Sequence, residues 1–286
     1  WTLEYLGKNE KGEVLRRDEW GCTQVVPASE TSAYCVIDRP QLHTIEDIEA
    51  YSWPNPENTD GFFAGRKEII EQNYPDRFIN GFLDPGPFLV AFEILGYENL
   101  LFKLYDDPPM VKALLEKIFT YQKALIPRFR EMGADMITII DEVAGGGGMM
   151  FSPEIFRADY IPQYKDLFKE IHRNNMYVSV LFDGDISAIL EDLLDLDIDL
   201  HFFAQPKSTG IRELSQAFRG KRAVKMTVDM METLASADTQ EIEEEVKRFV
   251  EGFCTDKGGL VYQALRWHRP ENPSDNVATQ IKAMNR

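Results

Sequence analysis

Residues 136–142 read Met-Ile-Thr-Ile-Ile-Asp-Glu, and residues 176–185 read Met-Tyr-Val-Ser-Val-Leu-Phe-Asp-Gly-Asp. Each stretch is a short apolar run, rich in β-branched residues, that ends in carboxylates. Amphipathic patterns on either side predict helices over residues 108–132, 153–174 and 185–195. Buried strands that alternate with such helices are typical of parallel βα units.

The same alternation extends from residue 61 to the end of the chain. Further strands are predicted over residues 77–83, 199–203, 223–228 and 259–265, which makes six in all. The remaining predicted helices cover residues 62–73, 88–103, 209–218, 239–255 and 273–284. Sequential right-handed crossovers leave two choices, a doubly wound sheet or a (β/α)8 barrel.

We favour the α/β fold of the (β/α)8 TIM-barrel type, because no GxGxxG or GxxxxGK[ST] motif occurs at a strand–helix turn. The four glycines at 145–148 follow a strand but lack the lysine of a phosphate-binding loop, so an ordinary loop is favoured over a phosphate cradle. Only six strands are predicted. The first one or two strands of the barrel are therefore expected to be missing with part of the N-terminus, or replaced by the irregular N-terminal segment.

Residues 1–60 have a different pattern. A polar turn at 10–13 predicts a hairpin, and a short helix is expected from Thr44 to Tyr51, with prolines and asparagines around it. We predict that residues 1–60 form a hairpin and irregular extension packed on the barrel, and that 61–286 form the catalytic barrel, within a single structural domain. The chain begins with Trp1 rather than Met, which suggests that an N-terminal stretch is missing.

The composition excludes several classes of function. The 286 residues include 31 Lys and Arg against 48 Asp and Glu, a net charge of −17 that repels nucleic-acid phosphates. No apolar run approaches the roughly 20 residues that span a bilayer, so no membrane contact is expected. Cys22, Cys35 and Cys254 form no disulfide framework, and no signal peptide is visible, which favours the cytoplasm. A protein partner would present a basic face.

Polar residues follow nearly every predicted strand. In a barrel the carboxyl ends of the strands meet at one rim, where the chemistry takes place. Each residue alone has an ordinary explanation as a helix cap or loop residue, but together they predict a polar pocket. The candidates, in chain order, are Asp84, Asp141, Glu142, Asp183, His201, Gln205, Asp229, Arg266 and His268.

The carboxylates lead to the first catalytic hypotheses. Asp141 and Glu142 are adjacent, so on an extended strand they point to opposite sides and only one can enter the pocket. Two carboxylates close together would raise one pKa and create a general acid. Asp183 precedes Gly184, which lets backbone approach a ligand, although Asp183 could instead cap the next helix.

The histidines and Arg266 supply the remaining candidates. His201 lies within a strand and is either a core histidine or a ligand, whereas His268 stands at the last strand end and is the best histidine candidate. Arg266 could anchor a carboxylate or phosphate, or form a salt bridge across the rim. No HxxxH, HxH or Cys/His cluster is present, so no metal site is predicted, although an oxygen-rich site remains open.

Short motifs follow one another along nearly the whole chain. They are Gly133-Ala134-Asp135, Ile140-Asp141-Glu142, Ser152-Pro153-Glu154-Ile155-Phe156, Pro162-Gln163-Tyr164-Lys165, Phe182-Asp183-Gly184-Asp185-Ile186, Val228-Asp229, Gly258-Gly259, Asn272-Pro273 and Asn276-Val277. In order and spacing they resemble the uroporphyrinogen decarboxylase superfamily. The segments at 18–22 (Asp-Glu-Trp-Gly-Cys) and 96–98 (Gly-Tyr-Glu) are similar to its methyltransferase branch.

The resemblance implies a (β/α)8 barrel and one of two activities. One is cofactor-free decarboxylation of uroporphyrinogen, and the other is zinc-assisted methyl transfer between a methylated substrate, a corrinoid protein and a thiol. The zinc ligands of the methyltransferases, His-x-Cys and a later Cys, correspond here to Leu181, Asp183 and Arg266. Leucine has no donor atom and arginine cannot bind a cation, so the family's zinc site is not expected. The arginine-rich motif and the Pro-Trp-Thr signature of the decarboxylases are also absent from this sequence.

We therefore predict a methyltransferase that moves a methyl group from an aryl methyl ether or methylamine to a corrinoid (cobalamin) on a partner protein. Asp141, Glu142 or His268 would donate a proton to the leaving atom, Arg266 would hold a substrate carboxylate, and Asp183 would orient Arg266 or bind a hydroxyl. The alternatives are a decarboxylase of uroporphyrinogen or a smaller acid, and a non-catalytic protein that binds a tetrapyrrole or corrinoid. The family also makes a homodimer plausible.

Overall fold

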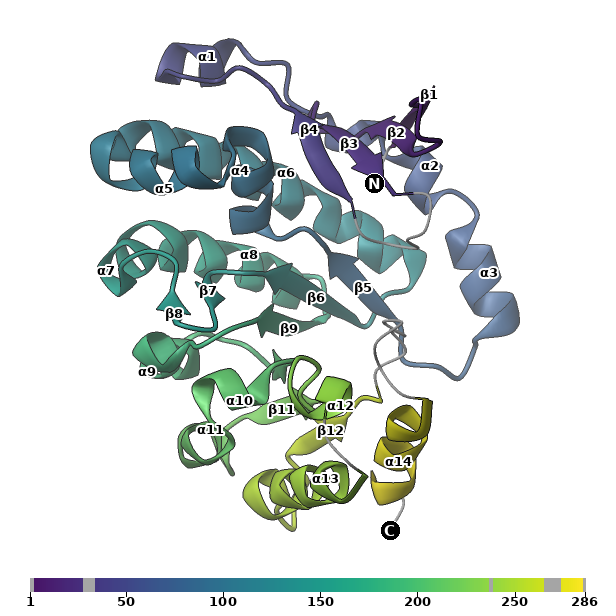
Figure 1. Cartoon of the computed structure of the whole chain (residues 1–286). Coiled ribbons are helices and arrows are strands. Elements are labelled where there is room, and N and C mark those ends of the chain that lie inside the picture. Colours follow the sequence, from purple (N-terminus) through teal and green to yellow (C-terminus); the bar gives the residue numbers. More distant parts are fainter. Residues whose placement is uncertain (1–2, 28–33, 237–238, 265–273, 285–286) are drawn as a thin grey trace. The chain divides into compact units, whose positions relative to one another are not determined.

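A computed structural model of the chain describes residues 3–27, 34–236, 239–264 and 274–284 (Figure 1). The chain divides into two compact units. The first contains residues 1–136 and 170–176, and the second contains residues 137–169 and 177–286. Arg266 and His268 lie outside the described residues.

The first unit begins with a small antiparallel sheet of order β1-β2-β3-β4. Its strands are β1 (Glu4–Lys8), β2 (Val14–Arg17), β3 (Thr23–Val26) and β4 (Cys35–Asp38). The polar turn at 10–13 connects β1 to β2, while β3 and β4 occupy part of the stretch expected to be irregular. Strands of four residues are too short for the two-residue hydrophobic period to be visible in the sequence.

Helices form the rest of the first unit, together with strand β5 (Asn80–Leu83). They are α1 (Ile45–Ala50), η1 (Pro56–Asn58), α2 (Asp60–Phe63), α3 (Arg66–Asn73), α4 (Pro87–Leu95), α5 (Tyr97–Asp106) and α6 (Pro108–Met132). The central element is α6, against which α1, α3, α4 and α5 pack (Figure 1). Trp20 is buried edge-on against Tyr121 of α6, with ring centroids 4.9 Å apart.

Two predicted helices of the first unit are each divided by a glycine. Gly65 (φ 72°) separates α2 from α3, and Gly96 (φ 81°) separates α4 from α5. Both glycines adopt a positive φ that other residues rarely tolerate, so each ends one helix and redirects the chain. The amphipathic pattern continues across each break, which is why the sequence predicts a single helix in both places.

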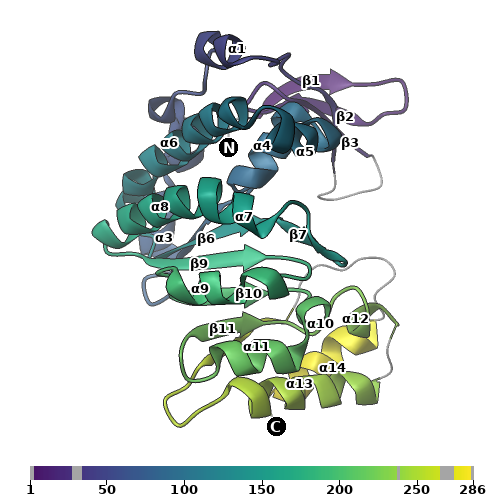
Figure 2. The ribbon, with the colours of Figure 1, turned by 90° about the vertical axis from the view of Figure 1, so that its left-hand side faces the viewer.

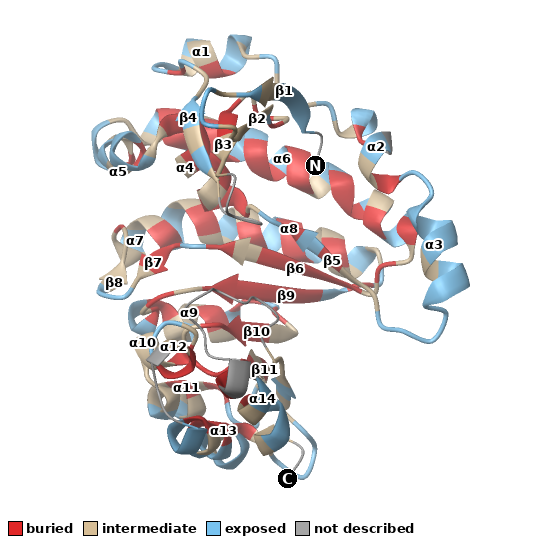
Figure 3. Cartoon of the chain, turned by 45° about the vertical axis from the view of Figure 1, so that its right-hand side comes forward, coloured by how far each residue is buried: buried red, intermediate tan, exposed pale blue. Residues whose placement is uncertain are grey.

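The second unit is built on parallel strands in the order β12-β11-β10-β9-β6. The strands are β6 (Met136–Asp141), β9 (Tyr177–Phe182), β10 (Leu200–Phe203), β11 (Ala223–Met226) and β12 (Leu260–Tyr262). The register pairs His201 with Val180 on one side and with Val224 on the other. Both β6 and β9 are buried along almost their whole length (Figure 3).

Helices connect these strands, and α9, α11 and α13 lie beside one another along the sheet (Figure 2). The connecting elements are β7 (Ala144–Gly145), β8 (Gly148–Met149), α7 (Pro153–Ile155), η2 (Phe156–Tyr160), α8 (Ile161–Arg173), η3 (Ser187–Ile189), α9 (Leu190–Asp195), α10 (Pro206–Thr209), α11 (Ile211–Phe218), α12 (Thr233–Ser236), α13 (Thr239–Phe253) and α14 (Ser274–Met284). The helix predicted over 153–174 is interrupted by η2, a π-helical turn.

The α/β class with parallel strands is confirmed, but the closed barrel is not. The described residues contain six strands of the predicted alternation, β5 included, and no eight-stranded barrel is closed among them. Part of the N-terminal stretch forms the antiparallel sheet β1–β4 instead of further parallel strands. The division expected at residue 60 stays a prediction. None of the helices in the described segments is long and apolar enough to cross a membrane.

Candidate functional site

The two faces of the second unit's sheet have different surroundings. Phe182 of β9 contacts Phe156 and Tyr164 on the helical side, with ring centroids 6.0 and 5.8 Å away. Leu181, the preceding residue, belongs instead to an apolar cluster with Phe202, Ala204, Ile140 and Met230. Side chains alternate along a strand, so this apolar cluster marks the opposite face of the sheet. A site at the strand ends would open from this second face.

Asp183 follows β9 directly and is the most perturbed carboxylate of the second unit's strand ends. Its side chain is half-buried, and its Oδ1 atom is fully buried without a hydrogen-bond partner among the described residues. Burial raises the pKa of Asp183 to about 7, helped by the negative charges of Glu142 and Asp229, while the Ala204 N–H opposes the shift. Asp183 can therefore hold a proton near neutral pH and act as a general acid.

The glycine-rich stretch fixes the backbone around Asp183. Gly184 has a φ of 84°, and a Cβ atom there would lie 2.6 Å from the Gly145 carbonyl oxygen. The Asp185 N–H donates to the same Gly145 oxygen at 2.8 Å. The β7–β8 turn thus packs directly on the backbone that carries Asp183, and only glycine fits at position 184. The four glycines shape a hairpin beside the carboxylate.

Asp141 and Glu142 have contrasting environments, as their adjacency predicts. Asp141 ends β6, is fully buried, and accepts a hydrogen bond of 2.5 Å from the Tyr164 hydroxyl. Burial, together with the Asp141 charge, raises the pKa of Tyr164 well above its ordinary value. Glu142 is exposed and lies close enough to Asp183 to raise the pKa of that carboxyl. Of the pair, Glu142 is the residue that influences Asp183.

Asp229 follows β11 and is enclosed by backbone donors. Its Oδ2 atom accepts from the Lys207 N–H at 3.2 Å, and its Oδ1 atom accepts from the N–H groups of Met231 and Glu232, both at 3.0 Å. Its own N–H donates to Glu245 at 2.7 Å. The structure places Asp229 where it closes the turn after β11, with both carboxylate oxygens engaged.

Glu245 and Lys207 complete a buried network that sequence reasoning missed. Glu245, on α13, has no exposed surface and accepts a 2.5 Å hydrogen bond from Thr233. The Lys207 ammonium lies 3.7 Å from Glu245 and 3.0 Å from Glu241. Burial raises the pKa of Glu245, while its hydrogen bonds and Lys207 lower it. The available signal was a glutamate on the core face of α13, three residues after the buried Ile242.

His201 lies on the helical side of β10, away from the strand ends. It is 2% exposed, and its ring centroid is 4.5 Å from that of Phe218 on α11. Burial lowers the pKa of His201 to about 3, and the positive charge of Arg222 lowers it further. His201 is therefore a neutral histidine among aromatic rings.

Gln205 and Asp84 are the two remaining candidates among the described residues. Gln205 is half-buried at the N-cap of α10 and makes no capping hydrogen bond. Asp84 belongs to the first unit, where it lines a cavity of about 140 Å³ with Glu93 and Tyr34. Burial raises the pKa of Asp84, and it raises that of Glu93 to about 7.

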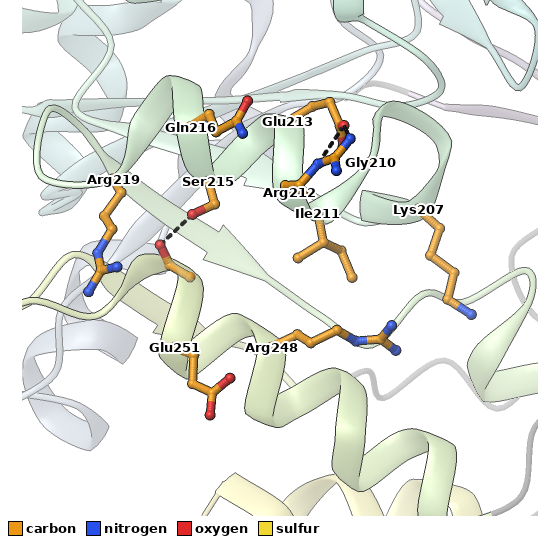
Figure 4. Close-up of a pocket in the computed structure, with 11 residues that line it drawn as sticks. Lys207, Gly210, Ile211, Arg212, Glu213, Ser215, Gln216, Arg219, Arg248 and Glu251 are labelled. Carbon is orange, nitrogen blue, oxygen red and sulfur yellow. Dashed lines mark hydrogen bonds and ion pairs between the residues drawn. The ribbon is translucent and has the colours of Figure 1, made fainter.

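A groove of about 730 Å³ lies in the helix layer of the second unit, between α11 and α13 (Figure 4). Two of its cations are engaged within the protein, because Arg212 pairs with Glu213 at 2.8 Å and Arg219 donates to the Cys254 carbonyl oxygen. Of the strand-end candidates that the structure describes, neither Asp183 nor any other lines the groove. Its size therefore does not make it the candidate site.

Leu181 occupies the position that corresponds to the first zinc ligand of the methyltransferases, and its surroundings are apolar. Leu181 is 5% exposed within the apolar cluster and offers no donor atom. Within the described segments, no group of three or more His, Cys, Asp or Glu side chains is arranged to hold a metal ion. The donor set beside Asp183 does not fit the zinc site of the similar methyltransferases.

Comparison with known proteins identifies the family. The uroporphyrinogen decarboxylase (URO-D) family model matches residues 19–286. The chain belongs to the URO-D family. The resemblance inferred from its motifs is thereby confirmed, and members of this family are enzymes, either decarboxylases or methyltransferases.

Two individual proteins show how far the similarity reaches. A uroporphyrinogen decarboxylase from Chlorobaculum parvum is 26% identical over 167 residues, which is 56% of this chain and 46% of that protein. The chain thus spans about half the length of this curated relative. A methyltransferase from Methanosarcina mazei has a similar structure, with a TM-score of 0.70 and 18% identity over 93% of this chain and 76% of that chain. This second likeness shows a shared fold.

Proposed function

We propose that this URO-D family protein is a methyltransferase. It moves a methyl group from a small methylated substrate, an aryl methyl ether or a methylamine, to a corrinoid carried by a partner protein. The observation that carries this proposal is Asp183. Its buried Oδ1 atom has no hydrogen-bond partner among the described residues, and this and its raised pKa suit a proton donor at a strand end. The fold shared with a Methanosarcina mazei methyltransferase is compatible with this reaction.

Asp183 supplies the proton that the leaving group needs. When the methyl group of an aryl methyl ether departs, the bond between the methyl carbon and the substrate oxygen breaks, and the electron pair stays on the oxygen. Asp183 gives its proton to that atom and becomes a carboxylate. The nearby charge of Glu142 keeps the proton on Asp183 until the transfer, because it disfavours a second negative charge.

The corrinoid is a substrate delivered by the partner, and it supplies the nucleophile that takes the methyl group. This chain supplies the proton donor and the apolar cluster beneath it. The partner is expected to present a basic face, because this chain carries a net charge of −17. Arg266 and His268 stay candidates for holding the substrate.

A spectroscopic assay tests the proposal. The full chain is mixed with cob(I)alamin and a panel of methoxyaromatics and methylamines, and methylcobalamin is followed by its absorbance. We expect methyl transfer from one class, and a loss of about 100-fold or more in kcat for D183N. The matched control is D185N, since Asp185 is two residues away and caps the Ser187 N–H at 3.0 Å.

Two results would overturn the assignment. Absence of methyl transfer across the panel, with the corrinoid still reduced, would move the interpretation to decarboxylation. Carbon dioxide release from porphyrinogens would then be measured, and absence of both products would favour a binding role. Equal loss of activity in D183N and D185N would remove Asp183 from the role of proton donor.

A further inference from the structure

Lys225 lies on the same face of the sheet as the apolar cluster. It is on β11, where Val224 and Met226 are buried and Lys225 between them is half-buried. The register pairs Lys225 with Phe202 on one neighbouring strand and with Val261 on the other. Its ammonium nitrogen stands 4.1 Å from the centre of the Phe202 ring. A positive charge thus lies against the buried apolar cluster on this face of the sheet.

No acidic partner of this charge is found in the described segments. Among the residues that the structure describes, no ion pair or hydrogen bond engages the Lys225 ammonium, and burial alone lowers its pKa. The chain has 48 acidic residues, so carboxylates are not scarce. Lys207, in the same unit, has three glutamates within 3.7 Å. An ammonium removed from water without a counter-ion is unfavourable for folding, which calls for a compensating role.

We propose that Lys225 is a specificity-determining residue, which binds the negatively charged group of an aromatic substrate whose ring lies on the apolar cluster. This inference rests on the proposed function and narrows its substrate class to methoxylated aromatic carboxylates. The ammonium would form a charge-assisted hydrogen bond with the carboxylate, and Phe202 and Leu181 would contact the ring. Methylamines, which are cations, would be repelled by Lys225.

Binding measurements on the full chain test this role without any methyl transfer. Benzoate and its neutral isostere benzamide are titrated by calorimetry into the wild type, K225M, K225R and K221M. Lys221 is the matched control because it is an exposed lysine just before the same strand. We expect wild type and K221M to bind benzoate at least about tenfold more tightly than benzamide, K225M to lose this preference, and K225R to recover part of it.

The opposite results are equally informative. A K225M variant that keeps the benzoate preference, or a wild type that binds neither probe, would overturn the proposal. If K225M does not fold, acetylation of Lys225 in the wild type is followed by peptide mass spectrometry. Protection by benzoate but not by benzamide would support the role, and equal protection would overturn it. Because no corrinoid is present, failure here is distinct from failure of the methyl-transfer assay.

Discussion

Two regions of the second unit each contain a lysine and an aspartate. The regions differ in the hydrogen bonds and ion pairs that these side chains form. Around Asp229, every carboxylate oxygen accepts a backbone N–H, and Lys207 lies among glutamates. At the end of β9, the buried Oδ1 atom of Asp183 has no hydrogen-bond partner among the described residues. Within the same residues, the Lys225 ammonium on β11 contacts the face of an aromatic ring and forms no ion pair. A network in which every polar group has a partner stabilises the fold. Asp183 and Lys225, which lack a full set of such partners among the described residues, retain groups that can act on a ligand.

A mutation in the hydrogen-bond network of Asp229, Glu245 and Lys207 should have the largest effect on stability. Glu245→Ala removes the acceptor of the Asp229 N–H and of the Thr233 hydroxyl, and leaves Lys207 with one partner fewer. We expect the free energy of unfolding to fall by about 3 kcal/mol, as measured by chemical denaturation. The exposed neighbour Glu244 is the control, and E244A should change stability by less than about 0.5 kcal/mol. Equal effects would mean that the network is not a structural unit.

His201 tests whether a buried polar atom that lacks a hydrogen-bond partner among the described residues is enough to identify a functional site. Its Nε2 atom also has no hydrogen-bond partner among the described residues, and its ring lies beside the rings of Phe203 and Phe218. Its folded pKa of about 3 lies below the ordinary value of 6.5, so the unfolded chain binds the proton more tightly. Stability should therefore fall as pH drops below 6.5, by about 2 kcal/mol between pH 7 and pH 5. H201L should lose this pH dependence in thermal or urea unfolding; a parallel curve for both proteins would contradict it.

Asp183 should show the reverse pH dependence. Its folded pKa, about 7, lies above the ordinary aspartate value of 3.8, so the folded chain binds the proton more tightly. The stability that protonation provides is present at low pH and is lost as pH rises from about 4 through 7. We expect D183N to be more stable than the wild type at pH 8 by about 1–2 kcal/mol, and the difference to vanish at pH 4. A pH-independent difference would show that the carboxyl is not perturbed in this way.

The smallest expected effect concerns Lys225 itself. K225M replaces a half-buried ammonium with an apolar side chain of similar length, beside Phe202 and the apolar cluster. We expect K225M to be more stable than the wild type by up to about 1 kcal/mol, which denaturant unfolding measures. K221M, which alters an exposed lysine, should be neutral. Destabilisation by K225M would indicate a structural role and weaken the contrast with Lys207.

The sequence by itself determined the elements whose signals are local. The helix predicted over 108–132 has these same bounds in the structure, since Asp107 caps it, prolines begin it, and Gly133 (φ 99°) ends it. The apolar strands could also be predicted from the sequence, and so could the acidic residues at their ends, which include Asp183. The helix breaks at Gly65 and Gly96 could not be predicted, because a positive φ does not change the hydrophobic period of the sequence.

Only the tertiary structure decided what each polar residue does. Asp183 and Asp229 look alike in sequence, yet two of the hydrogen bonds that distinguish them join Asp229 to Lys207 and Glu245, which lie 22 and 16 residues away along the chain. Glu245 and Lys225 lie within a helix and a strand, where no strand-end rule would select them. Burial and pairing depend on which elements pack together, and so does the pKa of each group. Hydrophobic periodicity can be read from residues that are close together in the sequence. Whether a charged group finds a hydrogen-bond or ion-pair partner depends on the folded chain.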